Sequence, residues 1–389
     1  QLRAGDYSEI VEDLCRHRNI DIGIAAFHYL YTRPANQSIG FILRSLNEED
    51  LVLKSRALAG LIKHFRTNQP MLNMLAFRQR VDDIIHKHWN NDLVDDEVII
   101  AILKCIAYGK IKDLYPLIEE KMKSDNSLLR QAAIMSAGET LSLKFKKELF
   151  QLLASKPDEE VVCKALSKFG VDSVKKLLIQ AVSNNQLIIV QKFPEILGNI
   201  PTQASMDFLI SLSDNNDFRT RLNAFTEINK LRINYPLLYI HPKQLNNIIF
   251  EEAKNLNIIN QVLYNEQLLF ETYSDKYLSF NNLIDKIKVK IDDNLKLIFT
   301  LLNIRYPLED YIELYEHIRS NDQILRENAI AYIDEHLNVQ LKASIIPIIE
   351  HQLNIPNNFS IDLDKHTVTA YLLAHSDPEI STLASKCFN

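Results

Sequence analysis

The chain has 389 residues, of which 47% are hydrophobic and 24% charged, and 50 acidic against 44 basic side chains give a formal net charge of −6. This composition is typical of a globular or repeat protein, and it argues against binding to a nucleic-acid backbone as the main task. Only 8 glycines and 12 prolines interrupt the sequence, which favours helices over a fold with many tight turns. The longest apolar run, residues 98–108, contains Lys104 and is too short to span a bilayer.

The first 110 residues show helical periodicity with irregular spacing between short polar loops. The expected helices cover residues 6–16, 22–31, 39–46, 51–65, 71–89 and 97–108. We interpret this part as degenerate helical repeats.

A regular block follows between residues 111 and 234, where an Asp is repeatedly followed seven residues later by an Ala. The pairs are Asp125/Ala132, Asp158/Ala165 and Asp217/Ala224, with Asn185 at the Asp position of a further unit. Single glycines close the units at Gly138, Gly170 and Gly198. Self-similarity with a period of about 27–33 residues is the signature of stacked helix pairs.

Each residue of this pattern has an expected physical task. The Asp caps the second helix of the pair, and the small Ala lets two helices approach closely. We therefore expect Ala132, Ala165, Ala224 and Ala329 to be buried. Gly138 is expected to end its helix in a left-handed conformation, and the recurring arginines to reach a turn carboxylate or carbonyl of a neighbouring unit.

The period falters after Leu231, at the helix breakers Pro236 and Pro242, and returns near residue 295. The expected helices cover residues 244–256, 258–273, 283–290, 295–303, 307–318, 323–337, 341–353, 364–374 and 378–388. The sequence thus predicts four parts, at residues 1–110, 111–234, 235–292 and 293–389.

The repeated block resembles HEAT repeats. The residues that carry this resemblance are Pro116, Asp125, Arg130, Ala132, Asp158, Val161, Val162, Ala165, Leu166, Gly170, Asp217, Arg221, Ala224, Asp322, Arg326 and Ala329, with Asp50/Ala57 and Asp377/Ala384 towards the two ends. The resemblance implies an all-α fold, an alpha-alpha superhelix of antiparallel helix pairs that holds partners.

One segment has a more specific resemblance. Residues 296–302 (KLIFTLL), 306–310 (YPLED), 320–322 (SND) and 326–329 (RENA), with Asp334, resemble the HEAT region that follows the membrane part of bacterial ADP/ATP-translocase-like nucleotide transporters. This resemblance implies a cytosolic module of a larger inner-membrane protein, with a cyclic-nucleotide-binding-like domain beyond it. A free-standing cytoplasmic adaptor is the alternative, and apolar stretches of about 20 residues encoded upstream of Gln1 would decide between them.

Nothing in the sequence predicts an enzyme or a bound cofactor. Every glycine is isolated, whereas phosphate cradles need clustered glycines that expose backbone N–H groups. A HEAT-like DNA glycosylase would need a basic concave face with aromatic residues and a catalytic Asp. The negative net charge and the single Trp argue against that class.

Metal sites are also not favoured. The four cysteines, Cys15, Cys105, Cys163 and Cys387, form no C-x-x-C pair, so we expect reduced and mostly buried thiols in a cytoplasmic setting. His86 and His88 point about 200° apart on a helix, so one ion cannot easily bind both, even with His64 nearby. The group Asp362, Asp364, His366 and His375 lacks the turn Gly of a Ca²⁺ loop, and helix capping by Asp364 explains it more simply.

Basic clusters are interpreted as solvated helix faces. They comprise Arg78, Arg80, Lys87, His88, Lys144, Lys146, Lys147, Lys286, Lys288 and Lys290. In a membrane-attached module, one of these clusters could instead meet anionic lipid.

The second helix of each pair lines the concave face in HEAT-like solenoids, and that face is the expected partner-binding surface. Its polar positions are Gln131, Lys164, Lys168, Gln191, Lys192, Asn223, Glu227 and Lys230. Because they combine both charges with amides, we expect a protein or peptide partner there and no nucleic acid.

Overall fold

The computed structural model describes residues 8–32, 36–47, 49–68, 75–89, 95–154, 156–264, 277–352, 365–375 and 378–388. All regular secondary structure in these ranges is helical and none is strand, as the sequence predicts. Contacts between Cα atoms divide the chain into two compact units, residues 1–184 and 185–389.

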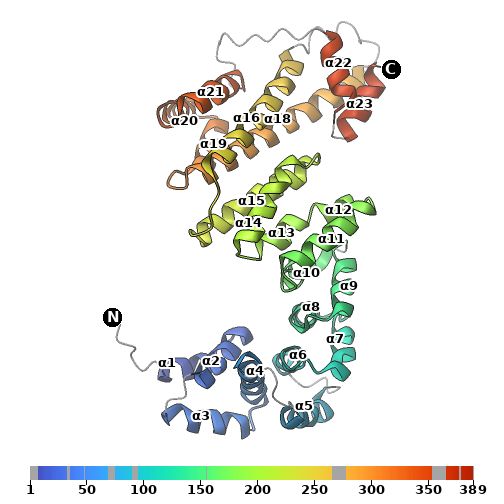
Figure 1. The fold of residues 1–389 in the computed structure, drawn as a ribbon, viewed down its shortest axis with the longest axis vertical. Helices are drawn as coiled ribbons and strands as arrows, with labels where there is room; N and C mark the ends of the chain where they lie inside the picture. The colour runs from blue at the N-terminus through green and yellow to red at the C-terminus, as the bar shows by residue number, and fades with distance from the viewer. Residues whose placement is uncertain are drawn as a thin grey trace. The chain divides into compact units, whose positions relative to one another are not determined.

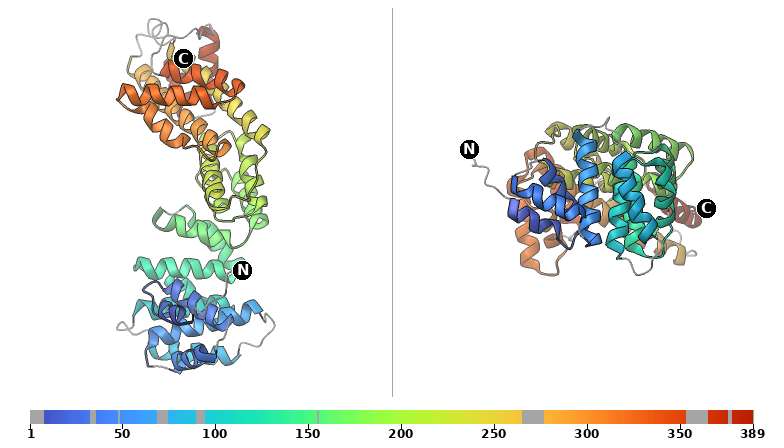
Figure 2. Two further views of the ribbon diagram at one scale, coloured as in Figure 1. Left: turned by 90° about the vertical axis from the view of Figure 1, so that its left-hand side faces the viewer. Right: turned by 90° about the horizontal axis from the view of Figure 1, so that it is seen from below.

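The first unit is built from two rows of helices (Figure 1). Its helices are α1 (Ser8–Cys15), α2 (Ile20–Thr32), α3 (Asn36–Asn47), α4 (Leu51–Asn68), α5 (Leu75–His88), α6 (Asp96–Gly109), α7 (Tyr115–Lys121), α8 (Ser127–Thr140), α9 (Leu143–Leu152), α10 (Glu159–Ser167) and α11 (Val171–Ser183). The even-numbered helices from α2 to α10 each pack on the next one of the row. Helices α3, α5, α7 and α9 pack against this row from one side, and Figure 2 shows the same helices, coloured blue to green, from two further directions.

The second unit is organised around one long helix. Its helices are α12 (Leu187–Val190), α13 (Phe193–Gly198), α14 (Gln203–Ser211), α15 (Phe218–Asn234), α16 (Pro242–Tyr264), α18 (Tyr277–Arg305), α19 (Tyr311–Arg319), α20 (Gln323–His336), α21 (Val339–Gln352), α22 (Lys365–Leu373) and α23 (Pro378–Phe388). Helix α18 packs against α15, α16, α19 and α23.

The continuity of α18 corrects the two helices expected at 283–290 and 295–303. Ile287, Ile291 and Leu295 are all buried at helical spacing across the expected break, so packing carries the helix through the polar residues between them. The side-chain amide of Asn294 there donates to the Lys290 carbonyl at 2.9 Å. A division at residues 292/293 would therefore cut a continuous helix. Similarly, α16 continues through the break expected at residue 257, and the expected helix 258–273 lies partly outside the described residues.

Three helix starts share one hydrogen-bonded loop. A Ser or Asn accepts from the backbone N–H of the cap residue two positions later, at 2.9–3.2 Å. An Arg four positions after the cap then donates to the carbonyl of that first residue, at 2.7–2.9 Å. The three sets are Ser124/Asn126/Arg130, Asn215/Asp217/Arg221 and Ser320/Asp322/Arg326. The structure thus repeats a motif of the form [Ser/Asn]-x-[Asp/Asn]-x3-Arg.

The first of these loops corrects the register of the Asp–Ala pattern. The side chain of Asn126, and not that of Asp125, caps α8 by accepting from Leu128 N–H at 3.0 Å. The small residue seven positions after the cap is therefore Ala133, which is buried, whereas Ala132 is partly exposed. The expected burial of Ala132 is wrong by one position. The expected burial of Ala165, Ala224 and Ala329 is confirmed.

Two of the three recurring arginines, Arg130 and Arg221, also join neighbouring helix pairs, as expected. Arg130 Nε donates to Asp158 Oδ2 at 2.5 Å, and Asp158 is the N-cap residue of α10. Arg221 Nε donates to the buried Glu252 of α16 at 2.8 Å. Each arginine therefore holds its own loop and the next pair with one guanidinium.

Replacing Arg130 with Met removes the guanidinium while keeping much of the apolar volume. We expect the free energy of unfolding to fall by about 1.5–3 kcal/mol, because the buried Asp158 carboxylate loses its charged partner. Denaturant unfolding followed by circular dichroism measures this change. The control Arg219→Met, at an exposed position of α15, should stay within about 0.5 kcal/mol. Equal losses in both variants would contradict the stabilising role of this link.

The expected left-handed stop at Gly138 is wrong, because α8 continues to Thr140 and Leu141 takes the left-handed conformation with φ 57°. Gly138 instead lies against the backbone of α10, where an added Cβ would be 2.6 Å from the Ala165 carbonyl oxygen. Gly198 ends α13, and the next residue, Asn199, has φ −83°. Of these three glycines, Gly170 has a positive φ, of 78°, but its ψ of 166° is not that of a left-handed helical residue, and it is the N-cap residue of α11.

Gly138→Ala and Gly40→Ala should change stability in opposite directions. At Gly138 the new methyl group forces the two backbones apart, and we expect the free energy of unfolding to fall by about 1–3 kcal/mol. At Gly40 of α3, no neighbouring atom lies within 4 Å of an added Cβ. The better helix propensity of Ala should therefore raise the free energy of unfolding by about 0.5–1 kcal/mol. Thermal unfolding of both variants measures the signs. A stabilised Gly138→Ala protein would show that α8 and α10 are not in close contact.

All four cysteines are buried, as expected from the sequence. Burial raises the pKa of the Cys15 thiol to about 12, with the nearby Glu12 carboxylate adding to the shift. The thiol is therefore protonated, and poorly nucleophilic, at neutral pH.

Candidate partner-binding groove

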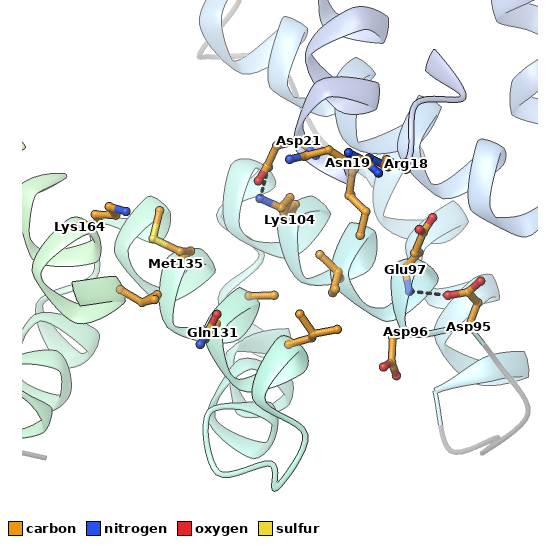
Figure 3. Close-up of a pocket in the computed structure, with 15 residues that line it drawn as sticks. Arg18, Asn19, Asp21, Asp95, Asp96, Glu97, Lys104, Gln131, Met135 and Lys164 are labelled. Carbon is orange, nitrogen blue, oxygen red and sulfur yellow. Dashed lines mark hydrogen bonds and ion pairs between the residues drawn. The ribbon is translucent and has the colours of Figure 1, made fainter. Parts of the chain in front are cut away.

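An open groove of about 660 Å³ crosses the even-numbered helix row of the first unit. Figure 3 shows its lining residues, which come from the start of α2, from α6, from α8 and from α10. Two of these helices, α8 and α10, are among those expected to carry the partner-binding surface.

The floor of the groove is an apolar stripe on α8. Leu128, Ala132 and Met135 follow one another at i, i+4 and i+7, the spacing of a single helix face. The side chain of Leu128 is 62% exposed. Ile100 of α6 and Val161 of α10 extend the apolar surface on either side. Exposed apolar side chains gathered in this way mark a surface that can exclude water with a partner.

Helix α8 carries a second stripe, one position further along, that builds the core. Leu129, Ala133 and Ser136 have the same spacing and are buried against neighbouring helices. From the sequence, the two stripes appear as one broad apolar face, and placing the cap at Asp125 hides the distinction. The register given by the Asn126 cap is the signal that separates core from groove.

One end of the groove is acidic. Asp95 caps α6 by accepting from Glu97 N–H at 2.9 Å, and Asp96 accepts from the side-chain amide of Asn126 at 2.7 Å. The Glu97 carboxylate pairs with the buried guanidinium of Arg56 at 2.5 Å. Acidic residues in the first turn suit the positive end of the helix dipole.

Basic side chains on the opposite rim are mostly paired. Lys104 of α6 forms an ion pair with Asp21 at the start of α2, and Figure 3 shows the two side chains directed towards each other. Lys164 of α10 pairs with Glu160 at 2.5 Å, one turn earlier on the same helix. Arg18 is exposed and lies beside Asn19 before α2.

Two of the eight predicted partner-binding residues, Gln131 and Lys164, line this groove. The amide of Gln131 donates to Asp158 Oδ1 at 3.2 Å, so it also supports the link between α8 and α10. Lys168 follows Lys164 by one turn and pairs with Glu139 at 2.9 Å, outside the groove lining.

The other five predicted residues belong to the second unit. Gln191 donates to the Asp217 carboxylate at 3.2 Å, and Asn223 donates to the Gln191 carbonyl at 3.0 Å. Lys230 pairs with Glu227 at 2.6 Å. Lys192 is the N-cap residue of α13. The structure thus gives several of these side chains roles between helices, and their predicted role in partner binding stays a prediction.

The candidate metal residues lie only partly within the described part of the chain. Within the described residues, no group of three His, Cys, Asp or Glu side chains is placed to hold a metal ion. The side chain of His88 and all of Asp362 and Asp364 lie outside the described part.

Three described members of the basic clusters form ion pairs. Arg78 pairs with Asp82 and Asp113, Lys144 with Glu119, and Lys286 with Glu379. The side chain of Lys87 lies outside the described part. Lys290, expected on a solvated face, is instead buried, with Nζ 3.8 Å from the centre of the Phe218 ring. The expected solvation of Lys290 is wrong because this residue lies on the face of α18 that packs against α15.

A second depression, of about 380 Å³, lies in the second unit. Lys290, Glu252 and Arg221 line it, together with Asn294 and His375. Arg221 and Glu252 pair with each other there. Its polar lining differs in chemistry from the apolar floor of the groove in the first unit.

No protein-family model matches the chain, and no curated protein matches it. Among solved structures, an engineered protein from a structural genomics consortium is similar over 98% of both chains, with 12% sequence identity and a TM-score of 0.29. A likeness of that degree carries no argument about fold or function. Among the described helices, none has the length and apolarity needed to cross a bilayer.

Proposed function

We propose that this chain is a non-enzymatic protein-interaction scaffold whose first unit holds a segment of a partner protein in the groove over α6, α8 and α10. The observation that carries the proposal is the stripe of Leu128, Ala132 and Met135, which is apolar and accessible in a surface depression. Leaving such side chains in water has no benefit for folding, so a covering partner explains them best.

We further propose that the helix pairs form a HEAT-like superhelical solenoid. The repeated capping loop supports this, because at Arg130 and Arg221 the arginine of the loop links one helix pair to the next in the manner of a stacked repeat. In such an array each pair contacts mainly its neighbours, and the exposed faces of the second helices make a long surface for partners.

The chemistry of the groove also supports adhesion more than catalysis. Its floor is apolar, and its charged groups stand at the rim, where Asp95 caps a helix and Lys104, Lys164 and Glu97 are in ion pairs. Groups held in this way shape and orient a bound segment. Proton transfer would need a titratable group aimed at the floor.

A photo-crosslinking amino acid placed at Leu128 of the full chain tests the scaffold proposal in cells of the source organism. We expect a light-dependent adduct with another protein at this position, identified by mass spectrometry. The control is the same amino acid at Leu143 of α9, which is 69% exposed but lies outside the groove. No adduct at position 128, or equal adducts at both positions, would contradict binding in the groove.

We also propose that the scaffold belongs to a larger nucleotide-transporter-like membrane protein and works on its cytosolic side. The support is the resemblance of residues 296–334, which form the end of α18, the loop after it, α19 and most of α20. We expect the gene to encode several apolar stretches of about 20 residues upstream of Gln1. A gene without them would remove the transporter and leave the free-standing cytoplasmic adaptor.

A further inference from the structure

We infer that the segment held in the groove of the first unit is an amphipathic α-helix with basic residues on one flank. This inference rests on the proposed function and names the chemistry of the partner. It follows from three properties of the groove: the lack of backbone partners, the length of the apolar stripe and the charge of the rim.

The groove offers side chains and few backbone groups. Its walls come mainly from α6, α8 and α10, and helices use their own N–H and C=O groups internally except at their ends. The amide of Gln131 is already directed to Asp158. A partner in extended conformation would therefore leave many of its backbone groups unpaired against an apolar floor. A helix satisfies them itself, so the groove favours a helical partner.

The apolar stripe has the length of a short helical seam. Met135 follows Leu128 by seven positions, which at a rise of 1.5 Å per residue span about 10 Å, or two helical turns. A partner helix can match this with apolar residues at i, i+3 or i+4, and i+7. Val161 and Ile100 then flank the seam on the neighbouring helices.

The charges at the rim of the groove indicate which side chains the partner carries beside its apolar face. Within the described part of the chain, Asp95 and Asp96 form no ion pair. Among the rim cations in the same part, Lys104 and Lys164 are paired, and Arg18 is the one that forms no ion pair. Among the rim groups outside ion pairs, two carboxylates against one guanidinium leave an excess of negative charge, and both carboxylates lie at the acidic end. The dipole of α6 offsets only about half a unit charge. Lys or Arg residues on the partner's flank would complement Asp95 and Asp96.

Binding of synthetic peptides to the full chain tests this inference by fluorescence anisotropy. The probe is an 18-residue peptide with Leu at helical spacing on one face and Lys beside it. One comparison peptide has the same composition with the leucines moved off that face, another has a central Pro, and a third has Glu in place of Lys. We expect only the first peptide to bind well, and its binding to weaken as salt is added.

Variants of the protein locate the binding. Leu128→Gln and the double change Asp95→Asn with Asp96→Asn should each raise the Kd of the basic helical peptide by about tenfold. Asn keeps the cap at position 95, and circular dichroism checks the fold of every variant. The controls are Leu143→Gln and the double change Asp125→Asn with Asp172→Asn, which remove equal apolar area or charge outside the groove. We expect both controls to bind as the parent does.

Equal binding of the Pro-containing or respaced peptide would overturn the helical partner, and equal effects of groove and control variants would overturn the site. These outcomes are separate from failure of the scaffold proposal. A specific cellular adduct at position 128 with a segment that lacks helical spacing would keep the scaffold and overturn this inference. Absence of any adduct there would remove the proposed function, whatever the peptides do.

Discussion

The guanidinium of Arg130 fixes how two neighbouring helix pairs of the first unit pack against each other. It donates to the carbonyl of Ser124 in its own loop and to the carboxylate of Asp158 at the start of the next pair. A helix pair that exposes one apolar face cannot be stable alone, so each pair needs its neighbour at a defined angle. Hydrogen bonds with fixed direction set that angle better than apolar contact does. The same arrangement recurs at Arg221, with Glu252 as the acidic partner.

Much of the fold could be predicted because caps and small residues obey local rules. The helix starts at Phe218 and Gln323 follow from side-chain capping by Asp217 and Asp322. The continuity of α18 could not be predicted, since the polar residues between Ile291 and Leu295 have the composition of a loop. Only the burial of residues on both sides shows that packing outweighs that local preference. Propensity is a weak guide wherever tertiary contacts are strong.

The candidate groove shows where reasoning from sequence stops. The polar residues Gln131 and Lys164, predicted to bind a partner, both line this groove, and their role in binding stays a prediction. The sequence does not predict the apolar floor, because Leu128 and Leu129 are the same type of residue, yet the first is exposed and the second is buried. Successive residues of a helix point about 100° apart. Placing the cap one residue too early therefore assigns exposed side chains to the core and buried ones to the surface.

The contact between Gly138 and Ala165 has a consequence for the two walls that α8 and α10 give to the groove. At Gly138 the backbones of the two helices lie too close for a side chain to stand between them, so we expect the two helices to move together. The distance between Met135 and Val161 is then set before any partner arrives. A partner would lose its own conformational freedom on binding, while the receptor would lose little. Selection in this groove would therefore act on the shape of the incoming segment, with little adjustment by the scaffold.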